Sequence, residues 1–120
     1  MQNLKVADLT IETRESDSQL MLVWEGEIHM QNPREHLEPY LASVLDYIQS
    51  HGLTLECDFR AINYMNSASI PPIVQFLRSL ATQKIQSTFF YDSNRKVHAA
   101  SFRALDVIAS KSEYTKIQGL

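Results

Sequence analysis

The feature that most constrains the fold is a repeated change in the spacing of apolar residues. Period-2 alternation, which is typical of strands, marks residues 9–12, 20–30 and 53–59, and enrichment in β-branched and aromatic residues favours another strand at 85–91. Spacing of three or four residues, which is typical of amphipathic helices, marks residues 37–48, 69–82 and 97–110. Strand–helix–strand units predict parallel pairing with right-handed crossovers, and the first two strands add an antiparallel edge.

The pattern therefore predicts an α/β fold. We expect a mostly parallel sheet of four to five strands with an antiparallel N-terminal edge and three or four helices. A chain of 120 residues suits one domain, here residues 1–120 with a core at about 9–110. Residues 111–120 fit a short helix, a last strand or a loose C-terminal tail, and the sequence leaves these three open.

Three local details follow from the same pattern. Met21 and Val23 are apolar as well as their neighbours, so this strand is expected to be covered on both faces near its start. Pro39 is expected in the first turn of the first helix, where a missing N–H costs no bond. The third helix is expected to pack on the core with a stripe formed by Val97, Ala100, Ala104, Leu105 and Ile108.

Composition narrows the function classes. The net charge of −3 and the pI near 5.7 argue against nucleic-acid binding, and the eleven Lys and Arg residues are scattered. No apolar run approaches the roughly 20 residues that span a bilayer, and the first residues have no apolar signal region. The single cysteine, Cys57, fits a reducing compartment. We expect a cytoplasmic protein without a membrane partner.

Motifs of catalysis are missing from the sequence. The four histidines are far apart and none lies at a metal-ligand spacing from another histidine or from Cys57. There is no G-x-S-x-G, P-loop or G-x-G-x-x-G sequence. Cys57 alternates with apolar residues and is interpreted as a buried small side chain rather than a reactive thiol. The sequence thus predicts a protein that is not an enzyme and has no metal or cofactor.

The most unusual segment is residues 62–74, I-N-Y-M-N-S-A-S-I-P-P-I-V, where a strand ends in Asn and Ser and a helix begins with two prolines. Ser69 is expected to cap this helix, because Ile-Pro-Pro would then form its first turn. Ser67 stays free in the loop, near N–H groups and a dipole end that favour an anion. Phosphorylation there would add about −1.5 to −2 charges, and the prolines would keep the surface rigid.

Residues 58–70, D-F-R-A-I-N-Y-M-N-S-A-S-I, resemble the signature of the STAS domains of bacterial anti-sigma-factor antagonists. In that family a central strand opens with Asp and ends in Met-Asp-Ser-Ser-Gly before a helix. Asp58 stands at the opening Asp, Asn66 where the family usually has Asp, and Ser67 at the phosphorylatable hydroxyl, while Ala-Ser replaces the usual Ser-Gly. The apolar positions of the strand are taken by Ile62, Tyr64 and Met65.

The words Y-M-N-S-A-S-I, E-G-E-I-H-M-Q-N-P and E-P-Y are similar to one branch of that family. This branch consists of small STAS-like proteins that are phosphorylated in partner-switch systems, some of which control a diguanylate cyclase. The resemblance implies a non-enzymatic antagonist whose switch is Ser67. It implies partner contacts by Asn66, Ser67, Ser69 and Ile70, and it implies that Asp58 orients the strand end.

The partners implied by the resemblance are proteins. One is a histidine-kinase-like anti-sigma factor that also acts as the Ser kinase, or another effector, and the other is a metal-dependent PP2C-type phosphatase. Two alternatives stay open. The helix end could hold a constitutive partner, an effector such as a diguanylate cyclase, or a small anion without phosphorylation. A small enzyme with an unrecognised site would instead show a deep pocket with strongly shifted titratable groups.

Overall fold

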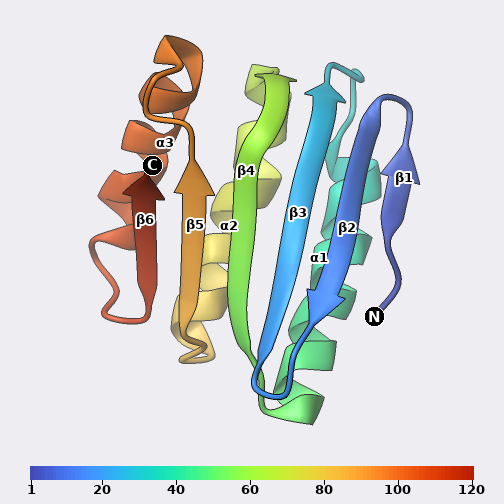
Figure 1. The fold of residues 1–120 in the computed structure, drawn as a ribbon, viewed down its shortest axis with the longest axis vertical. Coiled ribbons are helices and arrows are strands. Elements are labelled where there is room, and N and C mark those ends of the chain that lie inside the picture. The colour runs from blue at the N-terminus through green and yellow to red at the C-terminus, as the bar shows by residue number, and fades with distance from the viewer.

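Six strands form one sheet in the order β1-β2-β3-β4-β5-β6 (Figure 1). The computed structural model describes residues 1–120 except the side chain of Val97. The first two pairs are antiparallel and the next three are parallel. The strands are β1 Leu4–Val6, β2 Leu9–Glu15, β3 Gln19–Ile28, β4 Thr54–Met65, β5 Ser87–Tyr91 and β6 Thr115–Gly119. The predicted α/β class and antiparallel edge are confirmed, and the sheet has more strands than expected.

Three α-helices cover one face of this sheet, and in Figure 1 all three lie behind it. They are α1 Arg34–His51, α2 Ile70–Thr82 and α3 Lys96–Ala109, and a 3-10 turn, η1 Ser67–Ser69, precedes α2. Strand side chains that point toward the helices are buried. Aromatic rings fill the centre, with Trp24 stacked on Phe59 at 4.5 Å and Phe102 at 5.0 Å from Phe59 between centroids. None of the described helices is both long enough and apolar enough to cross a membrane.

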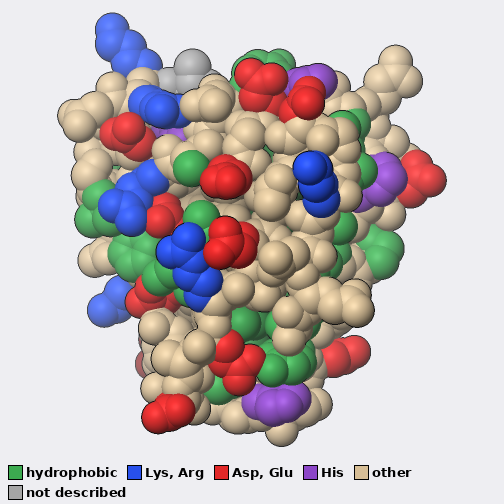
Figure 2. All heavy atoms as spheres, turned by 45° about the vertical axis from the view of Figure 1, so that its right-hand side comes forward, with side chains coloured by type: hydrophobic (Ala, Val, Ile, Leu, Met, Phe, Trp, Pro, Cys, Tyr) green, Lys and Arg blue, Asp and Glu red, His purple; other side chains and the backbone are tan. Residues whose placement is uncertain are grey.

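The other face of the sheet has no helix over it, which corrects the expectation for β3. Met21 and Val23 alternate with the buried Leu20, Leu22 and Trp24, so they lie on this open face, and they are half-buried rather than covered. The parallel strands β3 to β6 follow one another in a single direction, so right-handed crossovers place every helix on the same side. Val23 pairs with Glu12 and Asp58. Figure 2 looks obliquely onto this face and shows acidic, basic and apolar side chains interspersed.

One further expectation about helices was wrong, and the expected stripe of α3 was right for Leu105 and wrong for its alanines. Pro39 lies in the second turn of α1, because the helix already begins at Arg34. Its ring is exposed, so the carbonyl that loses a partner can bind water. In α3, Ala100 and Ala104 are exposed. The buried stripe consists of His98, Phe102, Leu105 and Ala109.

The buried stripe differs from the expected one because burial of the Phe102 ring removes more apolar area from water than burial of Ala100 and Ala104 would. Phe102 stacks on Tyr91 at 5.1 Å between centroids, and this contact fixes the rotation of α3. The side chain of Val97 lies outside the described part of the chain. Of the three possibilities for the C-terminal segment, the structure has the strand: β6 pairs with β5, and the N–H of Leu120 donates to the carbonyl of Tyr91.

Candidate functional site

Ser67 lies in η1, directly between the end of β4 and the start of α2, and its side chain is exposed. Its backbone carbonyl accepts from the N–H of Ile70, whereas its hydroxyl has no hydrogen-bond partner among the described residues. Ala68 beside it is exposed too. A modifying enzyme therefore has access to the hydroxyl, which is the geometry that a phosphoacceptor needs.

Asn66 builds the turn that presents Ser67. Its side-chain Oδ1 accepts from the N–H of Ser69 at 3.0 Å, and its Nδ2 donates to the carbonyl of Met30 at 2.8 Å. Its backbone N–H donates to the carbonyl of Ile28 at 2.9 Å. Both ends of the amide are therefore used inside the protein. Asn66 ties the end of β4 to the end of β3, and an amide serves better than a carboxylate because a carboxylate cannot donate.

Ser69 does not lie on the surface, which corrects the expectation that it joins the contact rim. It is 0% exposed, and its hydroxyl donates to the backbone carbonyl of Asn66 at 2.6 Å. It also makes no side-chain cap bond to α2. The cap comes instead from Asn66, whose side chain accepts from the N–H of Ser69, three residues later. Ser69 thus locks the turn from inside, and Ser67 is the hydroxyl that points outward.

The first amides of this helix are already used or missing, which corrects the expected anion site. The N–H of Ser69 is bonded to Asn66, and the N–H of Ile70 is bonded to Ser67. Pro71 and Pro72, which lie in the first turn as expected, have no N–H at all. The positive end of the helix dipole remains. A phosphate on Ser67 would therefore stay on the surface, in water, rather than bind into a nest of backbone amides.

The neighbouring surface is apolar and stiff. Pro71 is exposed, Ile70 and Val74 are half-buried, and Pro72 packs inward. A shallow hollow beside them is lined by Ile70, Pro71 and Val74 together with polar residues of α1 and α2. Two prolines restrict the backbone here, so docking of a protein on this surface would cost little conformational entropy.

Tyr64 is a surface residue that the sequence did not reveal. Its side chain is 46% exposed at the end of β4, three residues before Ser67. Period-2 alternation from the buried Ile62 would place Tyr64 inside as well. The register with β3 shifts here, because Gly26 pairs with Ile62 and Glu27 pairs with Tyr64. This β-bulge turns the ring outward, and exposed tyrosines are common anchors of protein interfaces.

Helix α3 braces the same strand end from the other side. β5 pairs with β4 only as far as Asp58, so the carbonyl of Ile62 has no strand partner on that side. His98 Nε2 lies 2.6 Å from this carbonyl, and Arg95 donates to it at 3.0 Å. His98 is buried, and its Nε2–H serves as the donor. The segment that leads to Ser67 is therefore held by β3 on one side and by hydrogen bonds from Arg95 and His98 on the other.

Asp58 does not orient the strand end, since it lies in the middle of β4. Its side chain is only 14% exposed and binds Arg60 on the open face of the sheet. Arg60 donates from its Nη2 at 2.8 Å, from its Nε at 3.0 Å and from its backbone N–H at 3.0 Å. These hydrogen bonds from Arg60 lower the pKa of Asp58. The residue stabilises the strand locally, nine residues before Ser67.

Other reactive groups lie apart from this segment. Cys57 is fully buried, as expected, and burial raises the pKa of its thiol. Burial also raises the pKa of Tyr40 to about 12. One cluster joins residues distant in sequence: side-chain ligand atoms of Asp8, Glu27 and His29 lie within 4.8 Å of one another. It is an exposed polar cluster, in which His29 Nε2 contacts Asp8 Oδ2 at 2.8 Å.

The strand order, the one-sided helices and the turn before α2 together define a STAS fold, the fold of anti-sigma factor antagonists. The chain resembles a chain in the complex of diguanylate cyclase SiaD with its activator SiaC from Pseudomonas aeruginosa, with a TM-score of 0.70 and 14% identity over 98% of this chain and 100% of that one. SiaC alone matches with a TM-score of 0.65 and 18% identity over 100% of both chains.

Anti-sigma factor antagonists match as well. The antagonist from Mycobacterium paratuberculosis has a TM-score of 0.64 and 18% identity over 87% of this chain and 86% of that one. Unphosphorylated SpoIIAA has a TM-score of 0.62 and 12% identity over 90% of this chain and 87% of that one. No family model matches the sequence, and no curated protein does. The expected STAS resemblance is thus confirmed at the level of the fold.

Proposed function

We propose that this protein is a partner-switching regulator that binds a protein partner through the surface around Ser67. Phosphorylation of Ser67 releases that partner. The observation that carries the proposal is the contrast between two serines in one turn: Ser69 is fully buried and bonded, whereas Ser67 is exposed with an unbonded hydroxyl. The contact surface is formed by Tyr64, Ser67, Ala68, Ile70 and Pro71, and we call it the switch surface.

Electrostatics explains how such a switch works without unfolding the protein. In the free protein a phosphate on Ser67 stays in water near a positive helix end, so it costs little. In a complex it would be buried against an apolar contact, and burying an unpaired charge costs several kcal/mol. Because about 1.4 kcal/mol corresponds to a tenfold change in affinity, a cost of about 3 kcal/mol lowers the affinity roughly 100-fold.

The proposed partners are proteins of the cytoplasm. A serine kinase that is itself an anti-sigma factor, or another effector, would modify and bind the chain, and a PP2C-type phosphatase would reset it. The likeness to anti-sigma factor antagonists supports the first kind of partner. The fully buried, unpaired Cys57 supports a reducing compartment.

Capture from a lysate of the native host tests the proposal. Immobilised Ser67→Ala and Ser67→Asp chains are compared by quantitative mass spectrometry of the bound proteins. We expect Ser67→Ala to retain a protein that Ser67→Asp does not. Ser18→Asp is the matched control, because Ser18 is exposed at the opposite end of β3 and should retain the same protein. Equal capture by the two Ser67 variants contradicts the switch.

A second function is favoured by a specific observation. The structures that include SiaC match this chain over nearly its whole length, and SiaC is the activator of a diguanylate cyclase. The chain would then regulate such an effector, or hold a constitutive partner, without phosphorylation. The mass of the protein purified from its host separates the two functions. A species heavier by one phosphoryl group, mapped to Ser67, supports the switch, and an unmodified chain under all growth conditions supports the alternative.

A further inference from the structure

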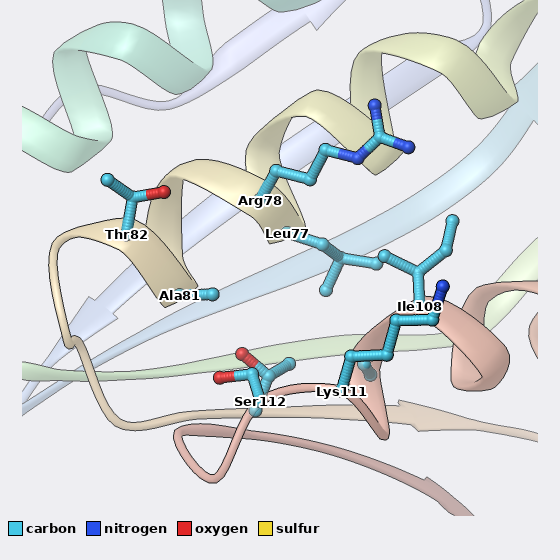
Figure 3. A pocket seen from close by; sticks show the side chains of 9 residues that line it. Leu77, Arg78, Ala81, Thr82, Ile108, Lys111 and Ser112 are labelled. Carbon is cyan, nitrogen blue, oxygen red and sulfur yellow. The ribbon is translucent and has the colours of Figure 1, made fainter.

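A pocket of about 340 Å³ lies between α2 and α3, close to the start of β6 (Figure 3). The C-terminal half of α2 forms one wall, and the end of α3 with the loop after it forms the other. Ser67 precedes the start of α2, and the pocket begins at Leu77, about 10 Å along the helix axis from Ile70. The pocket is therefore separate from the switch surface, and its volume falls within the ~300–1,000 Å³ that is typical of small-molecule sites.

The floor of the pocket is apolar. Leu77 and Ala81 come from α2, and Ile108 comes from α3. In Figure 3 the side chains of Leu77 and Ile108 approach each other across the hollow. Such a floor accommodates a short hydrocarbon or aromatic group, and it does not by itself select a charged one.

Two cations stand at the edge of this floor. Figure 3 shows Arg78 extending from α2 on one side and Lys111 extending from beyond α3 on the other. Both side chains are exposed, and among the described residues neither forms a salt bridge with a carboxylate. Two positive charges without a salt-bridge partner, on opposite walls of one pocket, favour an anionic group between them.

A buried hydroxyl adds a hydrogen-bond donor. Thr115 lines the pocket and is only 5% exposed, and its Oγ1 accepts from the hydroxyl of Ser87 at 3.2 Å. This pair carries two hydroxyl protons, and the bond between them uses one. Whichever hydroxyl donates in this bond, the proton of the other has no acceptor among the described residues, and Thr115 is the one of the two that lines the pocket. A buried donor without an acceptor is costly, so an oxygen of a ligand would satisfy it.

The partial negative charges at the C-termini of the two helices oppose the binding of an anion. Their magnitude therefore has to be compared with that of the two cations. α2 and α3 both end at this pocket, and each C-terminus carries about −0.5 charge. Their last carbonyls are partly satisfied, because Lys84 N–H donates to Ala81 and Lys111 N–H donates to Ile108. Two full positive charges on Arg78 and Lys111 exceed the two half charges. The rival explanation is that these cations only balance the helix ends, and it predicts no ligand.

We propose that this pocket binds a small organic monoanion with an apolar body, of the class of short-chain carboxylates. The carboxylate lies between Arg78 and Lys111, the apolar body lies on Leu77 and Ile108, and Thr115 donates to an oxygen of the ligand. None of these ligand-binding residues belongs to the switch surface, although Arg78 also lines the hollow beside Ile70 and Pro71, and the proposal does not depend on phosphorylation of Ser67.

Titration followed by NMR tests the site, with hexanoate as the probe and 1-hexanol as its neutral counterpart. We expect saturable shifts of the methyl resonances of Leu77 and Ile108 with hexanoate. The affinity for 1-hexanol should be at least about tenfold weaker, because the alcohol lacks the charge. Absence of saturable shifts overturns the proposal. Equal affinity for both compounds also overturns it, since the pocket would then be merely apolar.

Three variants locate the anion. Arg78→Gln and Lys111→Gln should each weaken hexanoate binding at least about fivefold and leave 1-hexanol binding unchanged. Lys5→Gln is the matched control, because Lys5 is an exposed cation on β1, at the other edge of the sheet. Unchanged hexanoate affinity in both pocket variants overturns the proposal, and so does an equal loss in the control. The amide spectra of all variants report whether the fold is kept.

Discussion

Asn66 supports the switch surface with a group that a carboxylate lacks. Its Nδ2 donates to the carbonyl of Met30, while its Oδ1 accepts from Ser69. The resemblance to STAS domains implied Asp at this position and left the substitution unexplained. The structure gives a physical reason, because here the side chain bridges an acceptor just after β3 and a donor before α2.

At this residue we predict that Asn66→Asp destabilises the protein by about 1–2 kcal/mol. The carboxylate loses the donor and faces an unpaired carbonyl. Urea unfolding measures the change. Asn63→Asp is the matched control, because the Oδ1 of Asn63 accepts from Arg95 and a carboxylate keeps that bond. Equal destabilisation by the two variants would show that the Met30 bond is not what holds the turn.

Asp58 gives a second prediction at the scale of residues. Hydrogen bonds from Arg60 lower its pKa in the folded state. The stabilisation is therefore present above the unfolded pKa of about 3.9 and is lost as the pH falls through the folded value. Asp58→Asn should flatten this acid limb of the stability curve by up to about 1 kcal/mol, because Arg60 is half exposed.

Thermal unfolding between about pH 2 and pH 7 measures that limb. Arg60→Gln should remove the same part of the pH dependence, since it removes the same partner. An acid limb that is identical in the wild type and both variants contradicts the assignment.

At the scale of elements, β-bulges decide which residues reach the surface. β4 is two residues longer than the stretch of β3 that it follows, and the register shifts twice. Alternation predicted the buried face of residues 53–59 correctly, because that stretch precedes the bulges. It could not place Tyr64, because a bulge has no signal in the alternation itself. The buried stripe of α1 was predictable, because the helical period of its apolar residues is unbroken.

Gly26 lies at one of these irregularities. Its φ is 99°, and a Cβ there would lie 1.9 Å from the backbone oxygen of Asp8. Gly26→Ala should therefore destabilise the protein by about 3 kcal/mol.

Gly52 is the matched control for that substitution. It also has a positive φ, of 64°, but a Cβ there would meet open space. Gly52→Ala should cost only about 1 kcal/mol. Chemical denaturation of both variants measures the difference, and equal costs would mean that the contact with Asp8 is not tight.

At the scale of the whole molecule, the chain is a sheet covered on one face, with its switch surface at one end of α2 and its pocket at the other. The order of strands and helices was predictable from apolar spacing alone. The open face of the sheet was not predictable, because apolar residues such as Met21 also occur on a strand face that no helix covers. The sequence does not distinguish a strand from a helix or a tail at β6, because its five residues carry few apolar side chains.

The candidate site was predictable in part. The exposed hydroxyl of Ser67 follows from its place between a strand and a helix, whereas the buried state of Ser69 depends on a turn closed by Asn66. Sequence spacing carries no information about which of two nearby serines turns inward. Packing of the turn against β3 decides it.

The central claim is that one surface charge at Ser67 releases a partner from an intact protein. The most direct measurement is the affinity of the partner captured by Ser67→Ala for two forms of the chain, unmodified and phosphorylated on Ser67. We expect the phosphorylated form to bind at least about 100-fold more weakly, with an unchanged circular dichroism spectrum. Equal affinity of the two forms, or a loss of affinity accompanied by unfolding, would contradict the account.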